Sequence, residues 1–443
     1  MRCMIPIFIA ILLHFQTIFS STSFDLSVNA EAAILLNPDN GAILYEKNAH
    51  VKLFPASITK IATALYTIHV YGDKLDTLIT AEHDSVAWVS QEAKKRSSYT
   101  LPAHWLEPNA THIGIKKGEI LSLSDLLNGM LISSGNDASN VIAQFIGGTV
   151  NNFINDLNAY LKNLGCKNTH FYNPHGLHHP EHLTTAYDMG IIAKEAMKYP
   201  IFCEIVKTVQ YTRPKTNMQQ PTTLIQTNRL LRKGPLYYSK AIGLKTGWTS
   251  EAKNTLVAAA EYNGRRLIAV LIKVKEREDL FKEAKKMFEA AFNQTCVQRV
   301  LLKNGPQKYI LNHPAASTPI KTYLKKDVCV NFYPAEEPQL NCNLHWLNIS
   351  LPIKADEQVG ELRITTSDGH LVQSVPLLAL NGAKESYFSW IKSFFKSEKK
   401  INESNFDKND NQDSLLSKKT WKSIGITTAI VFLIILLLLI RRV

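Results

Sequence analysis

Two side chains able to perform nucleophilic catalysis together stand three residues apart in this 443-residue chain: Ser57 and Lys60. If a helix begins here, positions i and i+3 lie on one face, so the amine would lie beside the hydroxyl. A serine hydroxyl is a weak nucleophile until a base within hydrogen-bond reach accepts its proton. Lys60 can act as that base if burial or a second cation lowers its pKa. The pair therefore indicates covalent catalysis through Ser57.

The same spacing also occurs where chemistry is not the expected interpretation. A serine and a lysine three residues apart recur at Ser250 and Lys253, Ser389 and Lys392, Ser393 and Lys396, and Ser397 and Lys400. For these pairs an exposed polar surface is the simpler interpretation. Spacing alone therefore does not identify a nucleophile, and the rest of the chain must supply the partners.

Two further groups of polar residues follow Ser57 in the sequence. Ser134-Gly135-Asn136 lies in a tight stretch between helical segments, where a hydroxyl and an amide can point into a cleft. A plain helix-linking loop is the alternative, and Ser27-Val28-Asn29 repeats the pattern by chance. Lys245-Thr246-Gly247 follows the strand-like run Ala241 to Leu244. Its cation and hydroxyl could hold a substrate carboxylate, while the glycine permits close approach of a substrate backbone.

Short apolar runs and turn signals predict a sheet assembled from distant segments. Residues 32–37 and 42–45 flank Pro38-Asp39-Asn40-Gly41, and residues 255–260 and 267–274 flank Asn263-Gly264, so both pairs are predicted β-hairpins. Helical periodicity occurs at residues 58–70, 125–132, 137–146, 153–164, 185–197 and 278–292. The order of these elements predicts one sheet covered by helices.

The two ends of the chain carry features of export and membrane attachment. Residues 1–23 begin with a basic residue, run apolar and end in small polar residues, which is the layout of a signal peptide. Residues 421–440 contain an uncharged apolar run with no polar face, as expected for a transmembrane helix rather than a buried core helix. The arginines of the tail 441–443 should stay cytoplasmic, which places the body of the chain outside.

The residues between these ends divide into four expected parts. Residues 24–295 hold the sheet-and-helix region, and residues 296–382 change to short β-like runs broken by turn residues, typical of a small all-β domain. Residues 383–397 set apolar side chains against lysines, as an amphipathic surface helix does. Residues 398–420, rich in Lys, Asn, Asp and Ser, are expected to form a disordered tether. Cys329 and Cys342 of the β domain could pair in an exported protein.

The formal net charge of +12 and a group of histidines raise two other function classes. The basic residues are spread along the chain and concentrate only at residues 384–400 and 418–422, which favours contact with anionic lipid over nucleic acid. The histidines are His170, His175, His178, His179 and His182. They lack a His-Glu-x-x-His helix and an acidic partner set, so we expect a histidine-rich cleft loop, with no metal and no cofactor.

Taken in order, the three polar groups resemble the triple signature of penicillin-binding proteins and serine β-lactamases. Residues 54–60, 134–138 and 243–247 are similar to the low-molecular-mass D-Ala-D-Ala carboxypeptidases in particular, and the likeness covers about residues 30–390. It implies an α/β (α+β) β-lactamase/transpeptidase-like catalytic domain, with an antiparallel sheet covered by helices. A small all-β domain and a C-terminal transmembrane helix would follow.

The resemblance also implies what the protein does and where. It predicts an enzyme that removes the terminal D-alanine from peptidoglycan stem pentapeptides, and that β-lactam antibiotics acylate. The catalytic domain would lie on the periplasmic side of a bacterial cytoplasmic membrane, held by a single-pass C-terminal helix. The number of copies that assemble, the preferred third residue of the stem peptide, and any endopeptidase or transpeptidase activity stay open.

The resemblance assigns a role to each motif residue. Ser57 would form the acyl-enzyme, Lys60 would accept its proton, and Ser134 would relay a proton to the leaving D-alanine. Substrate binding would fall to Asn136, which would orient the substrate amide, to Lys245 and Thr246, which would bind the terminal carboxylate, and to Gly247 and Trp248. Backbone N–H groups of Ser57 and Trp248 would form the oxyanion hole.

Two departures and two rival functions accompany this resemblance. After the third motif the family has a small Ala-Gly pair where this chain has Ala252-Lys253-Asn254, and residues 88–111 look longer than the family's connection. A serine β-lactamase is the nearest rival, yet the Glu-x-x-Leu-Asn context of class A enzymes is missing between Ser134 and Lys245. A non-catalytic peptidoglycan-binding scaffold is the other, although all motif residues keep their chemistry.

Overall fold

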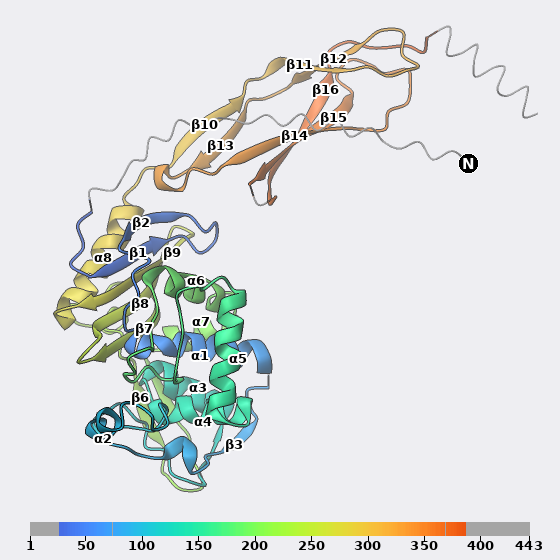
Figure 1. The fold of residues 1–443 in the computed structure, drawn as a ribbon. Helices are drawn as coiled ribbons and strands as arrows, with labels where there is room; N and C mark the ends of the chain where they lie inside the picture. The colour runs from blue at the N-terminus through green and yellow to red at the C-terminus, as the bar shows by residue number, and fades with distance from the viewer. Residues whose placement is uncertain (1–25, 73, 368, 387–443) are drawn as a thin grey trace, which may run out of the picture. The chain divides into compact units, whose positions relative to one another are not determined.

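The computed structural model describes residues 26–72, 74–367 and 369–386 (Figure 1). The expected signal peptide (1–23), tether (398–420), transmembrane helix (421–440) and tail (441–443) lie outside these residues, as does most of the expected amphipathic segment (383–397). Within the described ranges, no helix has both the length and the apolar character needed to cross a bilayer. The described chain forms two compact units, which are residues 26–299 with 330–339, and residues 300–329 with 340–386.

A five-stranded antiparallel sheet forms the centre of the first unit. Its order is β2-β1-β9-β8-β7. The strands are β1 Ala32–Leu36, β2 Ile43–Lys47, β7 Ala241–Thr249, β8 Lys253–Tyr262 and β9 Arg265–Val274. Both predicted hairpins are confirmed, β1 with β2 and β8 with β9. Strand β1 then pairs with β9, which joins segments more than two hundred residues apart. The edge strand β7 carries the third motif.

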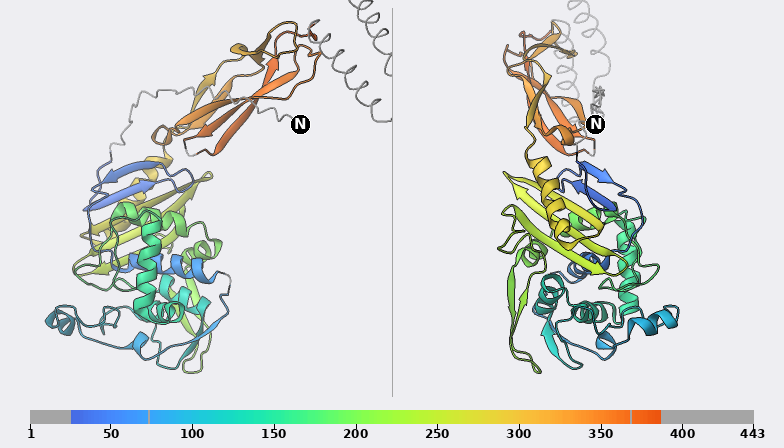
Figure 2. Two further views of the ribbon diagram at one scale, coloured as in Figure 1. Left: turned by 45° about the vertical axis from the view of Figure 1, so that its right-hand side comes forward. Right: turned by 90° about the vertical axis from the view of Figure 1, so that its left-hand side faces the viewer.

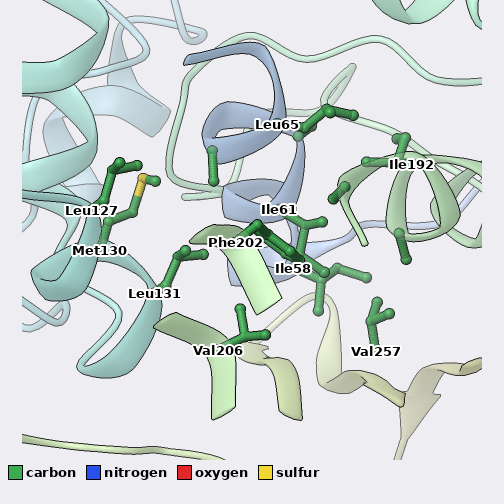
Figure 3. Close-up of a cluster of buried hydrophobic side chains, with 14 of the residues drawn as sticks. Ile58, Ile61, Leu65, Leu127, Met130, Leu131, Ile192, Phe202, Val206 and Val257 are labelled. Carbon is green, nitrogen blue, oxygen red and sulfur yellow. The ribbon is translucent and has the colours of Figure 1, made fainter. Parts of the chain in front are cut away.

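Alternation along the strands gives the sheet two apolar faces. Ile34, Val257 and Val270 point to one face and pack with helices α1, α3, α6 and α7 (Figure 3). Leu35 and Leu271 point to the other face and pack with side chains of α8. Helix α8 covers this face of the sheet (Figure 2). Because neighbouring strand residues face opposite sides, a near-continuous apolar sequence fills two cores at once. Each buried Val, Leu or Ile contributes about 1.5 to 3 kcal/mol to this packing.

The helices lie where periodicity predicts them, with two additions. They are α1 Thr59–Tyr71, α2 Gln91–Arg96, α3 Leu123–Ile132, α4 Asn136–Gly147, α5 Val150–Asn163, α6 Ala186–Ala196, α7 Pro200–Lys207 and α8 Arg277–Phe292. Short 3₁₀ turns occur at η1 Ala56–Ile58, η2 Asp84–Val86 and η3 Pro334–Glu336. Helices α2 and α7 are not anticipated, because six and eight residues are too short to show a period.

Two small two-stranded sheets and a distant segment complete the first unit. The sheets are β3 Leu78–Thr80 with β4 Ile120–Ser122, which η2 and α2 separate in sequence, and the hairpin β5 Gln210–Arg213 with β6 Thr222–Ile225. The distant segment is residues 330–339 with η3, where Glu336 accepts hydrogen bonds from Arg265 of β9 at 2.6 and 2.8 Å. Arg265 also lies over the ring of Tyr333. The unit that holds the central sheet therefore includes residues from well beyond the expected boundary at 295.

The second unit is built on a five-stranded antiparallel sheet of order β11-β12-β16-β15-β14. Its strands are β11 Gly305–Leu311, β12 Ile320–Leu324, β14 Leu340–Trp346, β15 Gln358–Thr366 and β16 Leu371–Ala379. A separate two-stranded ribbon, β10 Val297–Leu302 with β13 Val328–Phe332, has residues assigned to each of the two units. Ile320, Val359 and Ala379 are among its fully buried residues. The predicted pairing of Cys329 with Cys342 is not present, because both residues are free thiols, Cys329 on β13 and Cys342 on β14.

Candidate active site

Ser57 and Lys60 meet at the start of α1. The chain enters through Pro55, turns once in η1, and continues as α1 from Thr59. This places the Lys60 amine 3.0 Å from the Ser57 hydroxyl oxygen, as the i, i+3 spacing predicts. The Lys60 side chain is fully buried, whereas Ser57 is partly exposed. A nucleophile open to substrate therefore lies beside an amine shielded from water.

The buried amine has two further partners. Lys60 Nζ donates to Asn136 Oδ1 at 2.7 Å and to the backbone carbonyl of His175 at 2.7 Å. These two oxygens can only accept hydrogen bonds. A neutral amine has two protons, so both are used there and its lone pair is left facing Ser57. The sequence motifs indicate Asn136. They do not indicate the His175 carbonyl, because every residue has a backbone carbonyl and the residue type does not show which one is used.

The pKa of Lys60 lies well below its ordinary value. Burial is the largest cause, because the charged form loses its hydration, and the nearby Lys245 ammonium lowers the pKa further. Asp137 opposes both effects. Lys245 is itself fully buried, and this burial lowers the pKa of Lys245 to about 7. The geometry thus favours an uncharged Lys60, the form that can accept a proton.

The second motif occupies the short connection between α3 and α4. Ser134 is buried in the left-handed conformation (φ 66°), and Asn136 begins α4. Asp137 holds this connection, since its carboxylate accepts hydrogen bonds from the backbone N–H groups of Ile113, Gly114 and Ile115. The Asn136 amide therefore reaches Lys60 from a braced backbone, and Ser134 stands two residues earlier in the same turn.

The third motif lies near the end of a strand. We expect the motif to end the strand-like run 241–244, and β7 continues two residues past Gly247, to Thr249, and pairs with β8 throughout. Lys245 Nζ donates to the backbone carbonyl of Thr246 at 2.9 Å, and the Thr246 hydroxyl donates to the Thr227 hydroxyl oxygen at 2.9 Å. Apolar patterns predict strands that are too short at such places, because a polar functional residue interrupts the apolar pattern but does not interrupt the hydrogen bonding between strands.

Gly247 brings β7 against the nucleophile. A Cβ atom built on Gly247 would lie 2.7 Å from the backbone nitrogen of Ser57 and 2.5 Å from Thr255 Oγ1, too close for any side chain. The backbone nitrogen of Ser57 therefore lies against β7, next to the residue that precedes Trp248. The Trp248 side chain is largely exposed. These contacts bring Ser57, Lys60 and Asn136 together directly, with β7 as the facing wall.

The unusual segment 88–111 packs beside this site. Helix α2 is followed by Tyr99, whose ring meets the rings of His178 and His179, each with centroids 5.6 Å away. His178 also contacts Phe54, three residues before the nucleophile. The segment and the histidine-rich loop therefore line the same region near Ser57. In the described residues no group of three or more His, Cys, Asp and Glu side chains is arranged to hold a metal ion.

Comparison with known proteins agrees with this geometry. The family model described as D-alanyl-D-alanine carboxypeptidase matches residues 19–276. The chain is 32% identical to the D-alanyl-D-alanine carboxypeptidase DacF of Bacillus subtilis, over 82% of this chain and 88% of that protein. It is 31% identical to DacC of Escherichia coli, also named a D-alanyl-D-alanine carboxypeptidase, over 82% and 86% of the two chains.

Solved structures give the same result for the fold. Penicillin binding protein 5 from Haemophilus influenzae superposes with a TM-score of 0.54 at 25% identity, covering 81% of this chain and 98% of that one. The Streptomyces K15 DD-transpeptidase superposes with a TM-score of 0.52 at 29% identity, covering 60% and 98%. The fold is thus the α+β fold of DD-peptidases and transpeptidases, and the chain belongs to the D-alanyl-D-alanine carboxypeptidase family, the low-molecular-mass penicillin-binding proteins.

Proposed function

We propose that this protein is a serine D-Ala-D-Ala carboxypeptidase that removes the terminal D-alanine from peptidoglycan stem pentapeptides and that β-lactams acylate. Family membership supports the reaction class and the cell-wall substrate. The observation that carries the assignment to residues is the fully buried Lys60 amine, 3.0 Å from Ser57 Oγ and with a lowered pKa. Such an amine is a base, which a serine nucleophile requires.

The proposed reaction uses these groups in turn. Neutral Lys60 accepts the Ser57 proton while Oγ attacks the carbonyl carbon between the two D-alanines. The N–H groups of Ser57 and Trp248 stabilise the resulting oxyanion. Ser134 passes a proton to the leaving D-alanine nitrogen as the peptide bond breaks, which leaves an ester on Ser57. Water then hydrolyses the ester and restores the free serine.

Substrate binding uses the two walls of the site. On one wall Lys245 and Thr246 bind the terminal carboxylate, and Gly247 leaves room for the substrate backbone beside β7. On the other wall Asn136 orients the substrate amide. Lys245 in its charged form also keeps Lys60 uncharged, since two nearby cations disfavour each other. Binding and base activation therefore share one residue.

The place of action belongs to the same proposal. An N-terminal signal peptide exports the chain, and a single-pass C-terminal helix holds it to the bacterial cytoplasmic membrane with the catalytic unit on the periplasmic side. The apolar run 424–440 followed by two arginines supports this topology. Membrane fractionation of the full-length protein, followed by protease treatment of intact and opened cells, tests it. A protein found in the soluble fraction would contradict the anchor.

Labelling with a fluorescent penicillin tests the catalytic assignment. We expect the purified protein to carry one label on the peptide that contains Ser57, and to release D-alanine from a stem pentapeptide. A Ser57→Ala variant should lose both properties. Labelling that persists in the Ser57→Ala variant would overturn the assignment of the nucleophile.

The lifetime of the label separates the rival functions. A carboxypeptidase acylated by penicillin keeps the label long after free drug is removed, whereas a β-lactamase sheds it quickly and destroys drug in excess of enzyme. A scaffold protein acquires no label. Following label loss over time on the same sample therefore decides among the three.

A further inference from the structure

The residue before the nucleophile is held in an unfavourable backbone conformation. Ala56 is buried and has φ 52°, in the left-handed region that residues with a Cβ atom rarely adopt. Such conformations persist only where the surroundings fix them, and they gather at functional sites. The contacts that fix Ala56 therefore bear on the geometry of Ser57.

The carbonyl of Ala56 is anchored by a chain of hydrogen bonds. Thr59 Oγ1 donates to this carbonyl at 2.8 Å, and the same Oγ1 lies 2.9 Å from Nε2 of His182. Thr59 has one hydroxyl proton, which goes to Ala56, so His182 Nε2 must be the donor to Thr59. Both side chains are buried. The chain thus runs from His182 through Thr59 to Ala56.

The other nitrogen of His182 fixes the same tautomer independently. His182 Nδ1 accepts a hydrogen bond from the backbone N–H of Tyr172 at 3.0 Å, so Nδ1 carries no proton. In a protonated ring, the Nδ1–H of His182 and the backbone N–H of Tyr172 would be two donors facing each other. Burial, with His179, His170, His178 and Lys60 nearby, also holds the pKa of His182 well below its usual value. The ring is therefore a neutral donor toward Thr59.

Gly176 shows how closely the histidine-rich segment packs on this carbonyl. A Cβ atom at Gly176 would lie 1.9 Å from the Ala56 carbonyl oxygen and 2.9 Å from Thr59 Oγ1. The neighbouring His175 supplies the carbonyl that accepts from Lys60. One segment therefore contacts both the peptide before the nucleophile and the amine beside it.

The Ala56 carbonyl and the Ser57 N–H belong to one peptide unit. The only cis peptide bond in the described residues is Leu351–Pro352, so the Ala56–Ser57 bond is trans, and its C=O and N–H point in opposite directions. Anchoring the carbonyl on the Thr59 side therefore aims the N–H at the opposite side, where Gly247 of β7 lies against Ser57 N. Donation to the carbonyl also polarises the N–H and strengthens it as a donor.

We propose that Thr59 and His182 are positioning residues for the oxyanion hole: they fix and polarise the Ala56–Ser57 peptide so that Ser57 N–H meets the developing oxyanion. This inference rests on the proposed function, because it concerns an oxyanion formed when Ser57 attacks a carbonyl. Both side chains are buried, so they act through the peptide and not by contact with the substrate. Their effect should appear in the transition state rather than in substrate binding.

The test compares Thr59→Val with Thr67→Val. Thr67 lies on the same helix, is equally buried, and donates to the backbone carbonyl of Thr63 at 2.7 Å, so it controls for loss of a buried hydroxyl. Removing a whole oxyanion donor costs about 100- to 1000-fold in kcat, so weakening one should cost about 10- to 100-fold. We expect Thr59→Val to lose this in kcat with little change in KM, Thr67→Val to stay within about twofold, and Thr59→Ser to recover most activity.

The ester carbonyl of the penicillin acyl-enzyme gives a second readout. Its infrared stretching frequency rises as hydrogen bonding from the oxyanion hole weakens, so it should rise in Thr59→Val and stay unchanged in Thr67→Val. His182→Phe keeps the ring that stacks on Phe171 but lacks the N–H, and should give a smaller rise. This variant tests the inference even if Thr59→Val does not fold.

The outcomes separate this inference from the proposed function. Wild-type protein that neither labels nor releases D-alanine would refute the function itself. An active wild type with Thr59→Val acylated as fast as Thr67→Val, an unchanged ester frequency in both Thr59→Val and His182→Phe, or no recovery in Thr59→Ser would overturn the positioning role alone.

Discussion

Two segments of this molecule share the Ser-x-x-Lys spacing and differ in nearly everything else. At residues 57–60 the spacing lies at the start of a helix, and the amine is fully buried 3.0 Å from the hydroxyl. At residues 250–253 it spans the turn between β7 and β8, where Ser250 and Lys253 are exposed and the Ser250 hydroxyl donates to Glu251 at 2.6 Å. Burial and fixed acceptors, rather than spacing, make an amine a base.

The largest difference between the segments should appear when each lysine is replaced. Lys60→Met keeps most of the length of the buried side chain but removes the base, so we expect acylation by penicillin to fall about 1000-fold, within the range of general-base effects. Lys253→Met removes an exposed cation from the turn and should leave the acylation rate within about twofold. Stopped-flow measurement of acylation compares the two variants. Equal losses of rate would contradict the conclusion that only Lys60 acts as a base.

A charge placed beside Lys60 should make it resemble an exposed lysine. Asn136→Asp sets a carboxylate where an amide oxygen now accepts at 2.7 Å, and an opposite charge stabilises the protonated amine. The pKa of Lys60 should therefore rise, and acylation near neutral pH should fall about 10- to 100-fold. The decisive sign is partial recovery at alkaline pH, where Lys60 loses its proton again. A loss independent of pH would mean that Asn136 acts only on the substrate.

The pH dependence of peptide hydrolysis should report the second buried lysine. Lys245 has a pKa of about 7, so it is charged below that pH and neutral above it. Only the charged form attracts the terminal carboxylate, so kcat/KM should fall as pH rises through about 7, by up to about tenfold per unit. Lys245→Arg stays charged and should flatten this alkaline fall. An alkaline fall that persists unchanged in Lys245→Arg would assign it to another group.

The smallest effect is expected in the turn segment itself. The Ser250→Ala and Lys253→Met double variant removes the whole second pair, and its melting temperature and kcat/KM should both stay close to wild type, since exposed pairs contribute about 0 to 1 kcal/mol. A clear change in KM would instead show that the turn after the third motif touches the substrate, which would give this departure from the family a function.

Most of the fold could be predicted from the sequence because most of it is periodic. Both hairpins and six helices carry apolar patterns long enough to read. The pairing of β1 with β9 could not be predicted in this way, because nothing in residues 32–36 identifies a partner strand more than two hundred residues away. Helices α2 and α7 are too short to show a period, and polar residues interrupt the apolar pattern of β7 before its last residues.

The candidate site divides in the same way. Ser57, Lys60 and Asn136 could be predicted from their residue types and their order along the chain, and the structure brings them into contact. The His175 carbonyl could not be predicted, since every residue has one. His182 was noticed as a potential metal ligand, but its two hydrogen bonds, to Thr59 and to the backbone of Tyr172, depend on a fold that the sequence alone does not display.

The pairing of Arg265 with Glu336 makes the order of the chain a poor guide to where it can be cut. Glu336 also accepts a hydrogen bond from Asn37, so one late carboxylate satisfies groups on or next to β9 and β1, two neighbouring strands of the central sheet. Protein ended at residue 295 would keep a buried guanidinium without its carboxylate, a loss of about 3 to 5 kcal/mol. A truncated protein that keeps only the catalytic unit must therefore also contain residues 330–339. The same residues must stay with the catalytic unit when the β domain is exchanged in evolution.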